Sequence, residues 1–177
     1  SEEVVLMTAS LARLLRQSIS NEDEVVPLAR EVEYAKGYLT IQKMRYKDKL
    51  EFEIDVEPSI LNIPLIKLVL QPIIENAIYH GLKYKESKGL LQVKGFMKDG
   101  NAVLQVIDNG VGMDEETLSH IYDKHKVNYH SNGVGVYNVQ KRLKLYYGEN
   151  YGITYESEKG VGTTATITIP GIQEESI

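Results

Sequence analysis

The chain has 177 residues, 42% of them hydrophobic and 25% charged, which excludes disordered and fibrous proteins and allows one well-packed domain with an appendage. It contains no cysteine, which excludes disulfides and thiolate metal sites and fits a reducing cytoplasm. The net charge of −5 argues against a dedicated nucleic-acid binder, and no apolar run approaches the roughly 20 residues that a membrane-spanning helix needs.

Two helices are predicted at the start of the chain. Apolar residues recur at helical spacing from Glu2 to about Ile19, and again from about Leu28 to Tyr46, after Pro27. The polar stretch SNEDE separates the two helices. The first helix has a wide apolar face and therefore needs a partner. A shift in composition near residues 47–49 marks the expected junction between this helical appendage and the core.

The core elements follow from changes in apolar periodicity. Leu50 to Val56 alternates apolar and polar residues, which predicts a half-buried strand. From Pro64 to about Leu82 the chain is apolar and too long for a strand, so we predict a buried helix that bends at Pro72. The later elements are strands 90–98 and 101–107 joined at Asp99-Gly100, a short helix from Asp114, a helix from about Gly133 to Tyr147, and a hairpin of 151–157 with 162–170. This order predicts an α+β fold, a two-layer α/β sandwich with an antiparallel sheet and helices on one face.

A polar stripe lies on the predicted buried helix, in the sequence LQPIIENAIYHGLK. Asn76 and His80 are four residues apart and Lys83 is three further, so all three project from one face, with Glu75 beside them. One interpretation is a helix that exposes an edge and holds a structural histidine. The other is a ligand groove, in which the Asn76 oxygen contacts Mg²⁺ and Lys83 meets phosphate.

The stretch VIDNGVGMDEE ends a predicted strand with a carboxylate. Asp108 continues the apolar row of Leu104 and Val106, so its side chain points into the protein, where a carboxylate requires partners. A planar base could donate a hydrogen bond from an exocyclic amine, and Gly110 and Gly112 would let a flat ring approach closely. The alternative is an aspartate that caps its own turn.

A pair of glycines opens the helix of the stretch NGVGVYNVQKRL. Gly133 and Gly135 can expose backbone N–H groups to an anion at a helix N-terminus. The alternative is a helix start that merely permits glycine. The stretch is not a dinucleotide-binding fingerprint, because Asn138 replaces the third glycine, and the chain contains no Walker A sequence.

In combination, ENAIYHGLK, DNGVGM and NGVGVYNVQKRL resemble the N, G1 and G2 boxes of the GHKL ATPases, in the same order and at similar spacings. More narrowly, LVLQPIIENAIYHG preceded by EVEYAKGYLTIQKMRY is similar to the LytS/YehU-type sensor histidine kinases. The resemblance covers nearly the entire chain. It implies a Bergerat fold, with residues 1–20 as part of a dimerisation helix, 21–47 as a connecting helix and 48–177 as the ATP-binding catalytic domain.

The resemblance also implies roles for individual residues toward ATP and Mg²⁺. Asp108 would accept a hydrogen bond from the adenine amine, with a water assisted by Thr163 or Thr164. Asn76 would coordinate Mg²⁺, with His80 and Lys83 near the phosphates. A lid at 124–132 would be disordered without ATP. The implied catalytic set is Glu75, Asn76, His80 and Lys83, and the implied nucleotide-binding set is Asp108, Gly110, Gly112, Met113, Asn132, Gly133, Val134, Gly135, Val136, Thr163 and Thr164.

One departure from the family pattern concerns the chemistry. Gyrase-like and Hsp90-like members have a water-activating glutamate four residues before the N-box asparagine, but Pro72 occupies that position here. Proline cannot act as a base, which favours transfer of the phosphoryl group to a protein side chain over hydrolysis. The resemblance therefore implies a protein histidine kinase. Its alternatives are an ATP-driven clamp of the gyrase, MutL or Hsp90 kind and a non-catalytic interaction module.

The expected phosphate acceptor is absent from this sequence. None of the four histidines, His80, His120, His125 and His130, lies in the acceptor motif of the family. We therefore expect a fragment that cannot phosphorylate itself, whose partners are ATP, the acceptor-histidine helix of the full-length kinase and a response regulator. The intact protein is expected to be a homodimer, and this fragment a cytoplasmic part of a membrane-anchored parent, without nucleic-acid or direct membrane contact.

Overall fold

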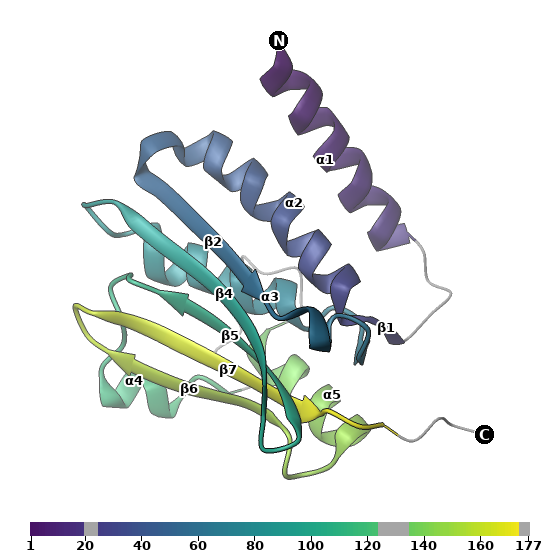
Figure 1. The fold of residues 1–177 in the computed structure, drawn as a ribbon. Coiled ribbons are helices and arrows are strands. Elements are labelled where there is room, and N and C mark those ends of the chain that lie inside the picture. The colour runs from purple at the N-terminus through teal and green to yellow at the C-terminus, as the bar shows by residue number, and fades with distance from the viewer. Residues whose placement is uncertain (20–24, 124–134, 174–177) are drawn as a thin grey trace.

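The computed structural model describes residues 1–19, 25–123 and 135–173. A five-stranded sheet forms one layer, with the strand order β2-β4-β5-β7-β6, and the helices pack on one face of it (Figure 1). The α+β, two-layer prediction is therefore confirmed. The strands are β2 (Leu50–Val56), β4 (Gly89–Lys98), β5 (Asn101–Asp108), β6 (Gly152–Glu158) and β7 (Gly162–Pro170). The helices are α1 (Glu2–Ile19), α2 (Leu28–Tyr46), α3 (Leu70–Asn76), α4 (Glu115–Ser119) and α5 (Val136–Tyr147).

The prediction of an antiparallel sheet was wrong for one strand pair. β2 pairs with β4 in parallel, with Leu50 opposite Gly89 and Val56 opposite Gly95. The connection between these two strands contains α3, and a connection of this length returns the chain in its original direction. The other three pairings, β4 with β5, β5 with β7 and β7 with β6, are antiparallel.

The sequence predicted one helix from Pro64 to about Leu82, and this prediction was wrong. The first residues of this segment form a short strand, β3 (Pro64–Ile66), which pairs antiparallel with β1 (Val25–Pro27) in a separate two-stranded sheet. The α-helix begins only at Leu70, so Pro72 lies in its first turn. The backbone nitrogens of a first turn have no partner within the helix, and Pro72 therefore causes no bend.

The second half of the same segment is a π-helix, η3 (Ala77–Leu82). The Lys83 N–H donates to the Ile78 carbonyl at 2.9 Å, a bond that spans five residues instead of four. The widened turn buries Ala77, Ile78, Gly81 and Leu82. A π-helix at this point changes which residues face the sheet, because its turns hold more residues than α-helical ones.

The hydrophobic core lies between the sheet and the helices. α2 contributes Leu28, Ala35 and Leu39, each at most 1% exposed. Their spacing is that of one helical face, and Pro27 precedes the helix as predicted. The facing side of the sheet contributes Leu91, Val93, Leu104, Val106, Ala165, Ile167 and Ile169.

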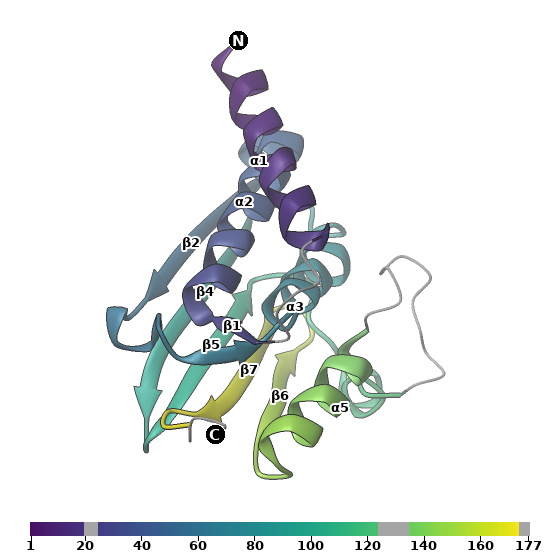
Figure 2. The same ribbon diagram turned by 90° about the vertical axis from the view of Figure 1, so that its right-hand side faces the viewer.

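The first helix lies beside α2, on the side away from the sheet (Figures 1 and 2). Several of its apolar side chains are exposed to solvent: Val4, Val5, Leu6, Met7, Leu11 and Leu15. Among the described residues, no helix has the length and hydropathy to cross a membrane.

Candidate active site

A cavity of about 430 Å³ opens between α3, η3 and the sheet. Its walls come from parts of the chain that are far apart in sequence: α3, η3, β5, the segment that follows β5, α5 and the β6-β7 hairpin. Its polar lining includes Asn76, His80, Asp108 and Thr163. The fold thus brings together residues from all three sequence boxes.

Asp108 provides the buried charge of this cavity. It is the last residue of β5 and lies on the same face as Leu104 and Val106, as its place in the alternating row predicts. Only 6% of the residue is exposed, and burial raises the pKa of its carboxyl group to about 6. Its Oδ1 accepts a hydrogen bond of 2.8 Å from the Gly110 N–H. The capped turn and the buried carboxylate, which the sequence left as alternatives, therefore occur together.

The glycines after Asp108 are required by contacts between backbones. A Cβ on Gly110 would collide with the backbone of Gly81, whose carbonyl also accepts a hydrogen bond of 3.0 Å from Val111. Gly112 has a φ of 65° and packs against the backbone of Glu158. Gly112 lines the cavity together with Met113, whereas Gly110 is not part of the wall.

Of the two candidate threonines, Thr163 faces the cavity and Thr164 faces the other side of the sheet. The hydroxyl groups of Thr163 and Ser157 are 2.7 Å apart, and Ser157 Oγ also accepts a hydrogen bond of 2.8 Å from the Met113 N–H. Sequence reasoning missed Ser157. The alternation of inward and outward residues along β6 could have revealed it, because this alternation places Ser157 on the inner face with Ile153.

The residues of the predicted polar stripe do not all face the same way, because the stripe runs from α3 through the π-helix. Asn76 and His80 line the cavity. The Lys83 side chain is exposed, and its Nζ lies 4.3 Å from the centre of the Tyr79 ring. Glu75 accepts a hydrogen bond of 2.7 Å from Gln71 Nε2, and partial burial raises the pKa of Glu75. Neither Lys83 nor Glu75 belongs to the cavity wall in this structure.

The start of α5 forms the far wall of the cavity. Gly135 is the residue before the helix, with φ −77° and ψ 169°, and both Gly135 and Val136 line the cavity. The helix therefore begins at Val136, slightly later than predicted. Asn132, Gly133, Val134 and the predicted lid at 124–132 lie outside the described residues.

The segment after α4 adds two titratable side chains that the sequence did not single out. His120 and Asp123 both line the cavity, and His120 Nδ1 lies 3.9 Å from Asp123 Oδ2. Asp114 accepts a hydrogen bond of 2.8 Å from the Thr117 N–H and caps α4, which confirms its predicted role as a helix start. Among the residues that the structure describes, no three His, Asp or Glu side chains are grouped to hold a metal ion.

Two protein-family models match parts of this chain. Residues 62–173 match the family model of histidine kinase-, DNA gyrase B- and HSP90-like ATPases. The chain belongs to this ATPase family. Residues 1–50 match a second family model, described as histidine kinase.

Within this ATPase family, the chain is similar in sequence to bacterial sensor proteins. It is 32% identical over 169 residues to the sensor histidine kinase YesM of Bacillus subtilis, covering 96% of this chain and 28% of YesM. It is 32% identical over 153 residues to the sensor protein LytS of Oceanobacillus iheyensis, covering 85% of this chain and 26% of LytS. The chain thus spans about a quarter of the length of these relatives, and the resemblance to LytS-type sensor kinases is confirmed.

A solved structure supports the fold. The histidine kinase domain of the blue-light activated histidine kinase from Erythrobacter litoralis EL346 superposes with a TM-score of 0.59 at 16% sequence identity. The match covers 95% of this chain and 74% of that one. At this identity the likeness concerns the arrangement of helices and strands.

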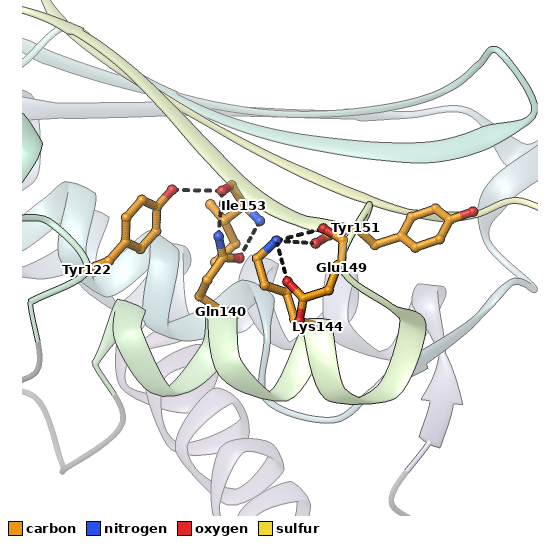
Figure 3. A network of polar contacts seen from close by, with 6 residues as sticks. All are labelled: Tyr122, Gln140, Lys144, Glu149, Tyr151 and Ile153. Carbon is orange, nitrogen blue, oxygen red and sulfur yellow. Dashed lines mark hydrogen bonds and ion pairs between the residues drawn. The ribbon is translucent and has the colours of Figure 1, made fainter.

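The far wall of the cavity is fixed to the edge of the sheet (Figure 3). The side chain of Gln140, on α5, donates to the Ile153 carbonyl at 3.0 Å and accepts from the Ile153 N–H at 2.7 Å. The Tyr122 hydroxyl donates to the same carbonyl at 2.7 Å. Lys144 donates to the Tyr151 carbonyl at 3.3 Å. These bonds satisfy part of the open edge of β6 and hold α5 against it.

The N-terminus of α3 is held by a buried carboxylate. Glu31, on α2, is 7% exposed and accepts hydrogen bonds from the N–H groups of Leu68 at 2.6 Å and Leu70 at 3.2 Å. Burial raises the pKa of Glu31, while these backbone bonds and the charge of Arg142 lower it. Arg142, on α5, donates to the carbonyls of Lys67 and Leu68. Three helices therefore meet at the loop that leads into α3.

Proposed function

We propose that this chain binds Mg·ATP in the cavity and that, in the full-length protein, it transfers the γ-phosphoryl group to a histidine on a helix outside this sequence. The observation that carries the proposal is the buried carboxylate of Asp108 at the cavity wall. Membership of the ATPase family and the match of residues 1–50 to the histidine kinase model support it.

The cavity fits an adenine nucleotide in size and in polarity. Its volume of about 430 Å³ lies within the range of roughly 300–1,000 Å³ that small-molecule sites occupy. Asp108 offers carboxylate lone pairs in a desolvated place, where a donor from the ligand would offset the cost of the buried charge. An exocyclic amine is such a donor. Apolar neighbours, including Ile73, Val106 and Ala165, suit the faces of a flat ring.

The donor set also fits Mg²⁺ held mostly by phosphate. Mg²⁺ binds oxygen, and in nucleotide sites it takes one or two protein ligands together with phosphate oxygens and water. The Asn76 amide oxygen would be the protein ligand, because Asn76 lies on the cavity wall. The first backbone N–H groups of α5 and the His80 side chain would meet phosphate oxygens. Lys83 would have to leave the Tyr79 ring to join them.

The residues favour transfer over hydrolysis. Pro72 stands in the first turn of α3, one turn before Asn76, where a water-activating glutamate would be needed. In the proposed reaction, the bond between the γ-phosphorus and the β,γ-bridging oxygen breaks and a bond from an imidazole nitrogen to phosphorus forms. ADP leaves, and the imidazole proton passes to solvent. A response regulator would then receive the phosphoryl group, and the acceptor helix would come from a dimeric, membrane-anchored parent.

Calorimetry tests the nucleotide site. Wild type is expected to bind ATP more tightly with Mg²⁺ than without it. Asp108→Asn is expected to weaken binding by at least tenfold, because the asparagine oxygen would accept from the Gly110 N–H and its Nδ2 donor would face the adenine amine. Asp114→Asn is the matched control, since Asp114 is exposed and an asparagine retains the helix cap. Equal binding by wild type and Asp108→Asn would refute the assignment of the cavity.

Phosphoryl transfer needs a second experiment. The chain alone is expected to acquire no label from γ-labelled ATP, whereas a longer protein that includes the preceding helix is expected to become labelled on a histidine of that helix. Labelling of the present chain by itself would contradict the proposal.

A further inference from the structure

Tyr155 forms part of the cavity wall from the edge strand. It lies on the inner face of β6, opposite Ala165 of β7, and its ring meets the Tyr122 ring edge to face with 6.1 Å between centroids. Its side chain carries a hydroxyl group, and Asn76 and Asp108 line the same cavity.

This hydroxyl group is an exception among the buried polar atoms of the described chain. It is inaccessible to solvent and makes no hydrogen bond with any described residue. A buried hydroxyl without a partner is destabilising, and phenylalanine would fill the same space without that cost. The hydroxyl therefore requires an explanation other than folding.

Asn76 is the side chain that the hydroxyl can engage. Burial and the charges of Tyr122 and Asp108 raise the pKa of Tyr155, and the Asn76 side chain lowers it. Asn76 lines the same cavity, and its side chain interacts with the hydroxyl without meeting the geometry of a hydrogen bond in this structure.

We propose that Tyr155 is a positioning residue that orients the Asn76 amide for the metal. With Mg·ATP in the cavity, Asn76 Nδ2 donates to the Tyr155 hydroxyl oxygen, and this bond turns Asn76 Oδ1 toward the metal. An asparagine amide has one acceptor end and one donor end, so holding the donor end fixes the direction of the acceptor. Partners of this kind commonly orient metal ligands.

A direct contact between the hydroxyl and the nucleotide is less consistent with the structure. The hydroxyl oxygen has no exposed surface, so a ligand in the cavity would meet the ring before the oxygen. The inference rests on the proposed function, because it assigns a role to Tyr155 only if Asn76 binds the metal.

The test is Tyr155→Phe, which removes the oxygen and keeps the ring. ATP affinity is measured by calorimetry in EDTA and in Mg²⁺, together with the Tm of the free protein. We expect affinity in EDTA to stay at the wild-type value and the gain in affinity from Mg²⁺ to fall by about tenfold. We expect the Tm to stay equal or to rise, because the variant no longer buries an unpaired hydroxyl.

Tyr122→Phe is the matched control. It removes a neighbouring hydroxyl that is satisfied, since Tyr122 donates to the Ile153 carbonyl. This variant is expected to lower the Tm and to leave the gain from Mg²⁺ unchanged. In an Asn76→Ala background, adding Tyr155→Phe is expected not to reduce the effect of Mg²⁺ on ATP affinity any further.

The outcomes separate this inference from the proposed function. If wild type gains affinity from Mg²⁺ and Tyr155→Phe gains equally, the positioning role is refuted and the nucleotide site stands. If Tyr155→Phe weakens binding equally in EDTA and in Mg²⁺, Tyr155 supports the nucleotide and not Asn76, which also refutes the inference. If wild type binds no nucleotide or shows no gain, the proposed function fails and this role fails with it.

Discussion

A methyl group on Gly81 would lie 2.8 Å from Asp108 Oδ1. Gly81 belongs to the π-helix and Asp108 to the end of β5, so a residue of the N box lies directly beside the buried carboxylate, and both residues line the cavity. Any side chain at this position would press on the Asp108 carboxylate. Its Oδ1 is already bound to the Gly110 N–H.

Gly81→Ala is therefore expected to displace the Asp108 carboxylate. The added methyl would push the side chain from its position and weaken ATP binding by at least tenfold, as measured by calorimetry. Gly37→Ala is the control, because a Cβ on Gly37 meets nothing within 4 Å and alanine is the better helix former. That variant should bind ATP as wild type does and gain about 0.5–1 kcal/mol of stability. Unchanged binding by Gly81→Ala would contradict the proposed geometry.

The raised pKa of Asp108 predicts how stability depends on pH. Burial raises this pKa from 3.8 to about 6, so the folded protein binds the proton more tightly than the unfolded chain does. The corresponding stability is fully present below about pH 4 and is lost as pH rises through 6. At pH 7 the ionised carboxylate costs on the order of 2–3 kcal/mol. Asp108→Asn should be more stable than wild type at pH 7 and lose this advantage near pH 4, as measured by urea unfolding.

The same titration should govern nucleotide affinity. Adenine needs the ionised carboxylate as an acceptor, so the affinity for ATP is expected to fall by roughly tenfold from pH 7.5 to pH 5. In Asp108→Asn the pH dependence of affinity over this range should be reduced. An equally steep dependence in the variant would assign the titration to another group.

Glu31 is expected to be essential for the stability of the α3 N-terminus. Glu31→Ala leaves the N–H groups of Leu68 and Leu70 without their acceptor and should lower the free energy of unfolding by about 2–3 kcal/mol. Glu33→Ala changes an exposed carboxylate of the same helix and should cost less than about 0.5 kcal/mol. Urea unfolding of both variants measures the difference. Equal losses would mean that the buried bonds contribute little.

Leu68 adopts a backbone conformation that disfavours its side chain. Its φ is 59°, in the left-handed region, and 39% of it is exposed. Leu68→Gly is expected to be more stable than Leu68→Ala by about 1 kcal/mol, because glycine removes the Cβ that the left-handed backbone disfavours. Both variants lose the leucine side chain, so their difference in thermal or urea unfolding isolates the backbone. If alanine is as stable as glycine here, the loop must relax without cost.

The parts of the fold that the sequence predicted are those with local causes. Pro27 and a long apolar period located α2, alternation located β2, and Asp99-Gly100 located the turn between β4 and β5, where both residues have a positive φ. The row that ends at Asp108 predicted a buried carboxylate because a strand needs only its own residues to define two faces.

The parts of the fold that the sequence did not predict depend on residues that are distant along the chain. β1 and β3 have three residues each, too few to show a period, and they exist because they pair with each other. Glu31 has the sequence context of an ordinary surface helix, and only the approach of Leu68 and Arg142 explains its burial. Lys83 shares the helical spacing of Asn76 and His80, but the π-helix and the Tyr79 ring place it elsewhere.

The π-helix makes the number of residues between Asn76 and Lys83 as important as their identity. Removing one residue from this segment could leave Asn76, His80 and Gly81 all present, yet it would restore α-helical spacing and turn the following side chains by about 100° around the axis. Gly81 would then no longer lie beside the Asp108 carboxylate. Length variation should therefore be tolerated far less here than substitution at most exposed positions.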